Sequence, residues 1–571
     1  MFKKFEIILL NIIQNKTKRR VVLIGTLIAF ILSVLMIAPT EIVKAKMLPG
    51  KNNDTFNIYV TLANGSSIEQ TQQVTQCVSK YVTQEKEVLN TEVFLGMGSP
   101  LDFAGLIKGS QFKNSENVAE IVLNLTKKHE REEPSYIMVQ RMRPVIQNAC
   151  EKLYPDTHIS FVEPPAGPPT LSAIVAEIYG DNANGIRKLA SRVEKVFQST
   201  KGLVDIDTME DEIYKTFDLK VNTTKAAKSG VSVKQINDII YIAFEGMDIA
   251  VKNSSKYDDQ IPLFLSLSNK SKRFTRKDLD SVRAKLTSLK LMNKRGMMVP
   301  VTELVTVIPT KSHPKIMTKD LHQMTNVMAE TDMVSQVYPL IKARNTILKT
   351  FTNEYDITKT GLFDLQLKNK TTGDVYQLKW DGEMKVTLDT FRDLGAAFIA
   401  ALILIFLLMV IYYKSYTLSG IILLGSFLSI IGVIVGHWIM NLFTADTFFL
   451  TATSMIGFIA LIGISSRNSL LLIDFTKALM DEKGMHKAEA IAYASATRAK
   501  PIFLTAIAIM LASTLLASDA VFGGLGVALI FGTVAAVVAS LIVVPVLLNI
   551  ADLESHFHFH ERKAVSIEEP V

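Results

Sequence analysis

Cysteine is scarce in this chain and nucleotide-binding motifs are missing, and each absence excludes a class of protein. Cys77 and Cys150 are the only two cysteines among 571 residues, too few for a disulfide-rich scaffold or a Cys-based zinc cluster. One bridge between them and two buried thiols both remain open. Neither GxxxxGK[ST] nor a post-strand GxGxxG occurs, so hydrolysis of ATP by this chain is not expected.

Long apolar runs are missing from about 350 consecutive residues in the first two thirds of the chain. Val21 to Ala38 is an uncharged run of 18 residues, long enough to cross a bilayer core of about 30 Å. Five more runs follow after Leu394, at roughly 394–413, 418–438, 448–473, 502–518 and 523–550. The sequence therefore predicts six membrane spans, one before and five after a large loop.

Basic residues mark the cytoplasmic side. Lys16, Lys18, Arg19 and Arg20 precede the first span, and no small-residue cleavage site follows it, which favours an uncleaved anchor at 21–40. Residues 1–20 combine apolar and basic side chains and predict a helix lying on the inner membrane surface.

The net charge of +7 comes from basic residues beside apolar segments, so it indicates membrane orientation rather than nucleic-acid binding. Connections predicted outside, Met440–Thr447 and Ala517–Gly524, hold no Lys or Arg. Those predicted inside hold Lys414, Lys477, Lys483, Lys487, Arg498 and Lys500. Both termini, including the tail 551–571, are expected in the cytoplasm and the large loop on the other side.

The large loop begins with a β-α-β-β-α-β pattern over 48–168. Apolar and polar residues alternate in Phe56–Leu62, and Ser66 with Glu69 fits the capping box of the next helix. Cys77 and Cys150 fall on the two expected helices. This order is typical of the ferredoxin-like unit, in which both helices cover one face of an antiparallel sheet.

The segment EPPAGPPT, Glu163 to Thr170, breaks the pattern before a second unit of the same kind. That unit is expected at 169–213 and 320–378, around a mixed insertion at 214–319. The predicted fold class is a membrane α-helical bundle of six spans, with five of them at 391–550, and a large α+β region outside the membrane.

Arg467 lies within the fourth span, seven residues before Asp474 and next to Asn468. Seven residues are nearly two helical turns, so Arg467 and Asp474 are expected on one face. A charge in a span costs about 3 kcal/mol, which favours a partner or a wet cavity. The alternative is that Arg467 snorkels to the cytoplasmic boundary, about 10 Å away.

Arg498 and Thr505 are also seven apart, with Pro501 suited to the first turn of the fifth span. Arg498 is alternatively one more cytoplasmic positive charge. In the last span a small residue recurs at every fourth position, which lets a neighbouring helix approach closely. These residues are Gly524, Ala528, Gly532, Ala536 and Ser540.

Four segments resemble the resistance-nodulation-division (RND) efflux pumps, specifically the second half of the multidrug members. They are GISSRNSLLLIDF, RAKPIFLTA, EPPAGPPT before AEIYG, and WDGEMK at Trp380–Lys385. The resemblance covers essentially the whole chain: one span, two porter subdomains with a docking insertion, and five spans.

The resemblance implies a trimeric pump in the bacterial inner membrane, coupled to a periplasmic adaptor (membrane fusion) protein and an outer-membrane channel. It implies an antiporter driven by the proton motive force, with no cofactor and no enzymatic activity. By matching position, Arg467 stands for the family's intramembrane lysine, Arg498 for an arginine and Thr505 for the relay threonine. Arg467 departs from the pattern, because an arginine keeps its proton and acts as a fixed countercharge.

The paired aspartates that load the proton in this family are missing, since Asp393, Asp446, Asp474 and Asp519 all fall near span ends. We therefore expect a second polypeptide, similar to the N-terminal half of an RND pump, to complete each protomer. The rival interpretation is a scaffold or sensor that does not transport.

The segment Phe94–Gly109 resembles the glycine-rich loop beside the family's drug pocket. Gly96, Gly98 and Gly105 are expected to make it mobile, with Phe94, Leu101 and Phe103 offering apolar contacts; a plain surface loop is the alternative. Heavy-metal cargo is the second possibility, but the methionines of Met292–Pro300 are too scattered to define a metal site. HFHFH at 556–560 is interpreted as a solvated terminus.

Overall fold

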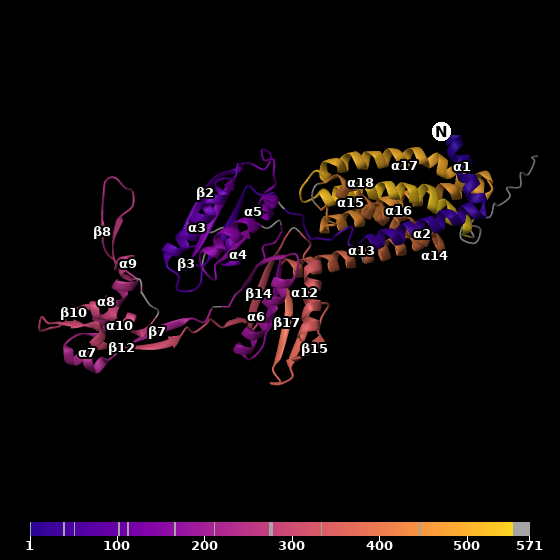
Figure 1. Ribbon diagram of the computed structural model, residues 1–571. Helices are drawn as coiled ribbons and strands as arrows, with labels where there is room; N and C mark the ends of the chain where they lie inside the picture. Colours follow the sequence, from indigo (N-terminus) through magenta and orange to yellow (C-terminus); the bar gives the residue numbers. More distant parts are fainter. Residues whose placement is uncertain are drawn as a thin grey trace, which may run out of the picture. The chain divides into compact units, whose positions relative to one another are not determined.

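The computed structural model describes residues 2–37, 40–50, 52–100, 103–110, 113–164, 167–210, 212–272, 274, 278–332, 334–444 and 447–551 (Figure 1). It divides into two compact units, Met1–Met209 with Met317–Val571, and Glu210–Ile316. The expected tail at 551–571, apart from Ala551, lies outside the described residues, and so does Asp446.

Two helices open the chain, α1 (Phe2–Gln14) and α2 (Lys16–Ile37). The expected boundary at residue 20 is wrong, because Lys16–Arg20 form the first turns of α2. Leu9 and Ile13 of α1 are fully buried in a cluster with residues of α17 (Lys487–Ala517) and α19 (Val544–Ile550). Part of the apolar face of α1 is therefore used against other helices of the bundle, although Ile7 and Ile8 stay exposed.

The region expected to be the first porter subdomain, and named so below, contains a four-stranded antiparallel sheet in the order β2-β3-β1-β4. Its elements are β1 (Thr55–Thr61), α3 (Ile68–Val82), β2 (Val88–Met97), α4 (Phe103–Lys108), β3 (Asn114–Leu125), α5 (Ser135–Cys150), η2 (Glu151–Leu153) and β4 (His158–Val162). The N-cap of α3 is Ser67, one residue later than expected, and its N–H donates to Gln70 Oε1 at 3.0 Å.

The core of this subdomain lies between the sheet and the helices α3 and α5. Val74, Val78 and Val82 recur at helical spacing on α3 and pack with Phe56 and Ile58 of β1. A disulfide joins Cys77 of α3 to Cys150 of α5, with the two Cα atoms 5.8 Å apart. The two helices are thereby tied together over the same face of the sheet.

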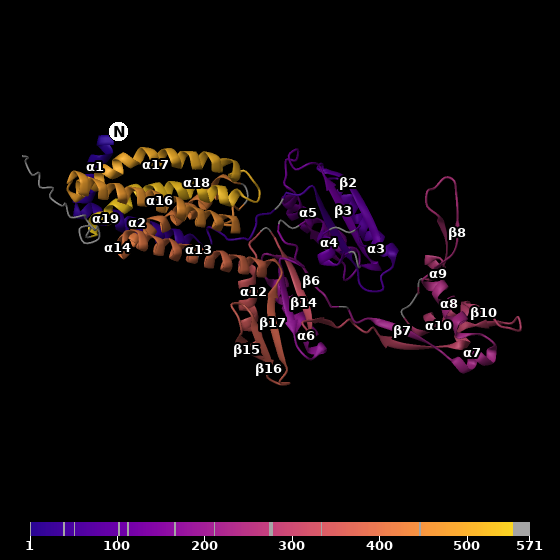
Figure 2. The ribbon, with the colours of Figure 1, turned by 180° about the vertical axis from the view of Figure 1, so that it is seen from behind.

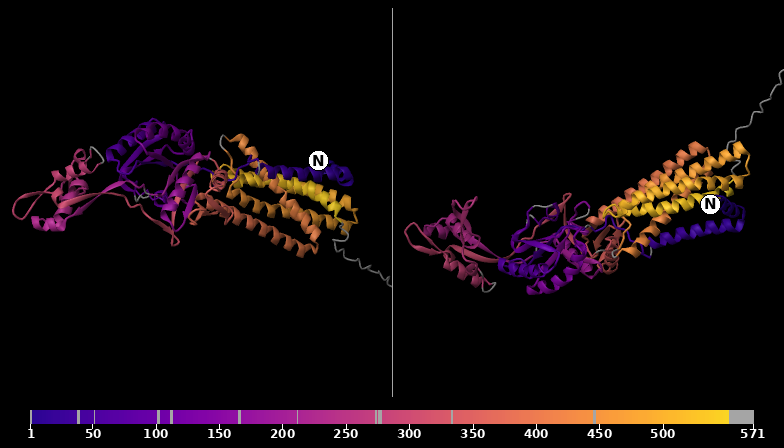
Figure 3. Two further views of the ribbon diagram at one scale, coloured as in Figure 1. Left: turned by 60° about the horizontal axis from the view of Figure 1, so that its bottom comes forward. Right: turned by 90° about the horizontal axis from the view of Figure 1, so that it is seen from above.

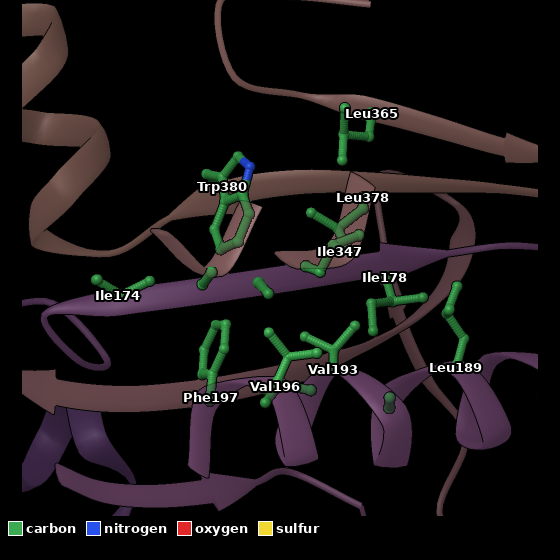
Figure 4. Close-up of a cluster of buried hydrophobic side chains, with 14 of the residues drawn as sticks. Ile174, Ile178, Leu189, Val193, Val196, Phe197, Ile347, Leu365, Leu378 and Trp380 are labelled. Carbon is green, nitrogen blue, oxygen red and sulfur yellow. The ribbon is translucent and has the colours of Figure 1, made fainter. Parts of the chain in front are cut away.

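The region expected to be the second porter subdomain, and named so below, has a sheet with the strand order β13-β14-β5-β17-β16-β15, with β6 paired to β14 (Figure 2). Its elements are β5 (Ile174–Tyr179), α6 (Ala183–Ser199), β6 (Leu203–Thr208), β13 (Met317–Lys319), β14 (His322–Thr331), α12 (Val337–Thr350), β15 (Tyr355–Lys359), β16 (Leu365–Asn369) and β17 (Val375–Asp381). Figure 4 shows side chains of α6 and of the sheet meeting in one core, where Phe197 stacks on Trp380 with centroids 6.2 Å apart.

The unit Glu210–Ile316 corresponds to the insertion expected at 214–319 and has its own core around Ile236, Leu286 and Leu304. Its elements are β7 (Lys215–Val221), α7 (Thr223–Ser229), α8 (Val233–Phe244), β8 (Met247–Lys252), β9 (Ile261–Leu265), α9 (Asn269–Lys272), α10 (Leu279–Ser288), β10 (Lys290–Met292), β11 (Met298–Pro300), α11 (Val301–Leu304) and β12 (Val305–Lys311). Antiparallel pairing of β7 with β12 joins the two ends of this unit.

Among the described residues, six helices are long and apolar enough to cross a membrane, counting α14 with α15 and α18 with α19 as one each. After α2 they are α13 (Glu383–Tyr413), α14 (Tyr416–Phe427), α15 (Ser429–Phe443), α16 (Ala452–Lys483), α17 (Lys487–Ala517), α18 (Gly523–Val538), the π-helical turn Ala539–Val543 and α19 (Val544–Ile550). The helices from α13 on run side by side in the orange and yellow part of Figure 3.

Several helices extend beyond the expected spans. Helix α13 starts at Glu383 rather than 391, and α16 continues to Lys483. Helix α17 begins at Lys487, so Pro501 lies inside it and not in a first turn. The hydropathy runs therefore marked the apolar parts of longer helices.

Candidate functional site

Helix α16 carries one uncovered stripe along an otherwise packed helix. The exposed residues recur every three or four positions, at Ile456, Ala460, Gly463, Arg467 and Leu471. The rest of the helix packs against α13, α14, α17 and α18. Arg467 is the charged member of this stripe, and within the described part of the chain no ion pair or hydrogen bond reaches its side chain.

Asp474, expected to share a face with Arg467, is engaged by a neighbouring helix. The hydroxyl of Tyr413 on α13 donates to its carboxylate at 2.7 Å, and that of Tyr412 lies 3.5 Å away. In the described chain, Arg467 and Asp474 therefore form no ion pair. Asn468 is buried, because consecutive helical residues point about 100° apart; it faces the interior of the bundle while Arg467 faces out of it.

Arg498 and Thr505 both lie on α17. The guanidinium of Arg498 sits over the ring of Phe475 on α16, 5.1 Å from its centroid, and its Nε is buried without a hydrogen-bond acceptor in the described chain. Thr505 is exposed, and its hydroxyl donates to carbonyls of its own helix, at Pro501 and Ile502. The two residues do not contact each other.

The small-residue stripe of the last span is fully buried where α18 and the following turn meet other helices. A Cβ on Gly524 would lie 2.3 Å from Thr451 Oγ1, and one on Gly532 would lie 2.2 Å from Leu461 Cδ1. Ala528, Ala536 and Ser540 are also buried, and Ser540 Oγ donates to the Ala536 carbonyl. The stripe thus lies where helices approach closely.

The expected mobile loop at 94–109 is largely regular structure, so that interpretation is corrected. Phe94, half-buried, belongs to β2, opposite Glu120 on β3, and α4 begins at Phe103. Leu101 and the side chain of Phe103 lie outside the described residues. Gly105, buried within α4, forms part of a helix rather than a hinge.

Polar contacts hold both ends of this segment. At its start, Ser99 donates from its N–H and its hydroxyl to the buried Glu120 carboxylate, which also accepts from Asn57 Nδ2 at 2.6 Å. At its end, Lys108 Nζ donates to Glu330 Oε1 at 2.8 Å, on β14 of the second porter subdomain. Burial alone would raise the pKa of Glu330, but the Lys108 ammonium holds it below its usual value.

A second set of charges joins the two porter subdomains. Arg143 on α5 pairs with Asp205 on β6 at 3.1 Å and with Asp332 at 3.4 Å. Glu163 follows β4, and burial raises its pKa to about 7 against the opposing charges of Arg143 and Lys46. The contact between the subdomains is therefore rich in buried charge.

Sequence reasoning missed these porter residues and also His437, a fully buried histidine on α15. The signal for His437 was available, because a titratable side chain inside the apolar run SIIGVIVGHWIMNLF is expensive and usually functional. The signal for Lys108 and Glu330 was not, because 222 residues separate them. No cluster of three or more His, Cys, Asp or Glu fit to hold a metal occurs in the described ranges.

Comparison with known proteins gives three findings. The sequence model of the AcrB/AcrD/AcrF family matches residues 6–552. The cobalt-zinc-cadmium resistance protein CzcA of Cupriavidus metallidurans is 21% identical over 408 residues, 70% of this chain and 35% of that protein. The multidrug resistance protein MdtC of Erwinia tasmaniensis is 22% identical over 378 residues, 65% of this chain and 33% of that protein.

Among solved structures, a heavy metal efflux pump in crystal form II has a TM-score of 0.71 to this chain at 17% identity. The similarity covers 95% of this chain and 52% of that one. The chain thus spans about a third of the length of the two relatives and about half of the solved pump.

Proposed function

The chain belongs to the AcrB/AcrD/AcrF family of RND efflux transporters, and we propose that it is one half of a proton-driven pump that exports drugs or other amphiphilic compounds. In this proposal it corresponds to the C-terminal half of an RND pump. A second polypeptide carries the other six spans and the paired aspartates.

The uncovered stripe of α16 carries this proposal. Lipid around Arg467 would cost about 3 kcal/mol, and neither a carboxylate nor a carbonyl of the described chain offsets that cost. Ala460 and Gly463 precede it on the same stripe, and a Cβ on Gly463 would meet nothing within 4 Å. A charged group next to small residues on one helix face suits a second helix bundle that approaches closely and brings acids.

In this mechanism Arg467 is a fixed cation. Its guanidinium stays protonated throughout, so it cannot carry the transported proton. It stabilises the partner's aspartates when they are ionised, and their protonation releases that attraction. The guanidinium of Arg498 on α17 lies over the Phe475 ring of α16 and adds a second positive charge beside these two helices. Thr505 remains the candidate relay hydroxyl.

The cargo proposal rests on the porter subdomains. Phe94 lies half-buried on the face of the first sheet opposite the one that α3 and α5 cover, paired with Glu120, whose carboxylate accepts hydrogen bonds from Ser99. An apolar side chain beside a few polar groups suits amphiphilic molecules. Export of heavy-metal ions is the alternative, favoured by the similarity to CzcA and to the solved metal pump.

We place the assembly in the bacterial inner membrane as a trimer of protomers, with both termini cytoplasmic and the large loop periplasmic. A periplasmic adaptor and an outer-membrane channel complete the route. The proton motive force drives the exchange, so no cofactor is needed.

Co-purification from native membranes in mild detergent tests the half-pump proposal. Mass spectrometry is expected to find a polypeptide with six apolar spans and a pair of aspartates inside one span. Gly463→Leu is expected to abolish its capture, because the leucine would block the α16 stripe. Gly25→Leu on α2 adds the same side chain at another open position and should leave capture unchanged.

Three results would count against the proposal. Proton-coupled efflux by this chain alone would remove the need for a partner. Unchanged drug resistance in cells carrying both Arg467→Gln and Arg498→Gln would refute the proposed coupling, and a chain that assembles without any efflux would favour the scaffold interpretation.

A further inference from the structure

A histidine is buried in the bundle at a place that the proposed mechanism does not use. His437 lies on α15 with no exposed surface. Its Nδ1 is 2.8 Å from the Val433 carbonyl oxygen, and its Nε2 is 2.9 Å from Ser454 Oγ on α16. A carbonyl only accepts hydrogen bonds, so Nδ1 carries the proton and Nε2 presents its lone pair to the Ser454 hydroxyl.

Three hydroxyls continue from Nε2 in a line. Ser454 Oγ is 3.0 Å from Thr451 Oγ1, which is 2.8 Å from Thr453 Oγ1. Thr453 Oγ1 is in turn 3.1 Å from the carbonyl oxygen of Val521. Either atom can be the donor in the two inner contacts. The Thr453 hydroxyl donates to the Val521 carbonyl in the structure. When it turns from that carbonyl to Thr451 Oγ1, the hydroxyls all donate inward, from Thr453 to Thr451 to Ser454 to the imidazole.

The outer end of this line reaches the turn between α17 and α18, where Val521 is half-buried. Asp519 lies in the same turn, fully exposed, and the backbone N–H groups of Phe522 and Val521 hold the pKa of its carboxyl below the usual value. An ionised carboxylate in this turn attracts protons from the solution.

The surroundings of His437 hold little other charge. On the segment before α16, Phe448 packs its ring 5.5 Å from the imidazole, and Lys46 sits over the neighbouring Phe449. The facing parts of α16 and α18 present hydroxyls and Gly524. In the described ranges neither Lys46 nor Asp519 bonds to His437. The three hydroxyls therefore form the polar connection between its Nε2 and the turn at Val521.

We propose that His437 is a proton-binding site loaded from the outer side of the membrane through Thr453, Thr451 and Ser454. A proton from the outer solution adds to Thr453 Oγ1, the O–H bonds of Thr453, Thr451 and Ser454 break in turn as each hydroxyl passes its own proton inward, and an N–H bond forms at Nε2. The hydroxyls then all donate outward, and Thr453 donates to the Val521 carbonyl. The resulting imidazolium donates from Nδ1 to Val433 and from Nε2 to Ser454, so both protonation states keep their hydrogen bonds.

This inference rests on the proposed function only for the use made of the proton. In that setting it gives this half of the pump a proton acceptor of its own, beside the fixed charge of Arg467. The partner's aspartates would then not be the only titrating groups in the membrane.

The site can be tested without transport. The full chain, labelled with ¹⁵N-histidine, is placed in phosphatidylcholine nanodiscs and followed by NMR from pH 8 to pH 4.5. One histidine is expected as the Nδ1–H tautomer at pH 8 and as imidazolium at acid pH, and His437→Gln should remove that signal. If this variant does not fold, Ser454→Ala assigns the signal by shifting it. A His437 signal that stays neutral at every pH overturns the proposal.

The loading path has its own variant. Thr453→Val is expected to slow exchange of the Nε2 proton with water at least about tenfold, because one hydroxyl of the line is lost. Thr514→Val removes an exposed hydroxyl that bonds only to the Met510 carbonyl of its own helix and should not change the rate. Equal exchange in Thr453→Val and wild type overturns the path.

The two proposals fail separately. Titration of His437 with unchanged efflux in the Arg467 variants would leave this site standing and refute the coupling proposed above. A neutral His437 with lost efflux in those variants would do the reverse.

Discussion

The role proposed for Arg467 depends on the exposed position of its guanidinium. It points away from the described bundle, while its neighbour Asn468 points into it. A guanidinium at that position is stable only beside groups that the described residues do not supply. The position of one side chain therefore decides how the α16 stripe is interpreted.

We expect Arg467→Gln to lower efflux about tenfold or more, because an interaction worth about 1.4 kcal/mol or more is lost. Arg467→Lys should retain part of the activity, since the charge remains. Dye efflux from cells with matched expression measures this. Arg392→Gln, which removes an exposed arginine paired with Asp389 and Asp393, is the control; equal efflux in the two Gln variants would argue against the coupling role.

The raised pKa of Glu163 predicts that the free energy of unfolding depends on pH. Burial raises its pKa from 4.5 to about 7, so the folded state holds a proton that the unfolded state releases. Stability from this group is therefore present at pH 4.5 and falls as pH rises to about 7.

Glu163→Gln should remove that loss and stabilise the chain at pH 8 by up to about 3 kcal/mol. Thermal unfolding in detergent at pH 5 and pH 8 measures it. Glu132→Gln changes a carboxylate that is 84% exposed and should have no such effect. A Glu163→Gln midpoint that follows the wild-type pH curve would show that Glu163 is ionised at both pH values.

At the scale of elements, the junction between β17 and α13 depends on one glycine. Gly382 has φ +84°, and the N–H groups of Glu383 and Met384 after it donate to the carbonyls of Ser172 and Ala173. A Cβ at Gly382 would lie 2.5 Å from the Ser172 carbonyl oxygen. Only glycine fits a backbone of this conformation with another chain segment so close.

Gly382→Ala is expected to destabilise the chain by about 3 kcal/mol or more, from strain and from the clash with backbone. Gly373→Ala is the matched control, with φ +76° and nothing within 4 Å of the added Cβ, and should cost about 1 kcal/mol. The near-UV signal of Trp380 during heating follows both. Equal costs would mean that the Ser172 segment moves away freely.

At the scale of the whole molecule, ion pairs join the two porter subdomains. Lys108 and Glu330 keep only 16% and 28% of their side-chain surface exposed. Removing one partner of such a pair leaves the other poorly solvated, whereas removing both does not. Arg143 and Asp205 repeat this arrangement at a second place.

Lys108→Met and Glu330→Gln should each lower stability by about 2 kcal/mol, and the double variant should lose less than the sum. Because the Glu330 pKa is lowered, the coupling should be complete above pH 4.5 and fade as pH falls through the folded value. A double-mutant cycle by thermal unfolding at pH 7.5 and pH 4 measures both points. Additive losses at pH 7.5 would show that the two residues do not interact energetically.

The amino-acid sequence by itself determined the class of protein, the six long apolar helices, the order of elements over 48–168, and the family, which the match over residues 6–552 confirms. Apolar run length, alternation and motif spacing are local properties, so they are legible along the chain. They also marked Arg467, Arg498 and Thr505 as unusual. They did not determine where a helix extends past its apolar part, as at Lys487, or that residues 94–109 are mostly strand and helix.

Only the tertiary structure decided which groups meet. In the structure, Tyr413 donates a hydrogen bond to Asp474, and Arg467 is exposed. Cys77 is bonded to Cys150, and His437 contacts the first of three hydrogen-bonded hydroxyls. Each of these depends on how helices or strands far apart in sequence pack together. The physical reason is that a helix has a fixed period but no fixed neighbour, and the neighbour is chosen by the shape and charge of every surface at once.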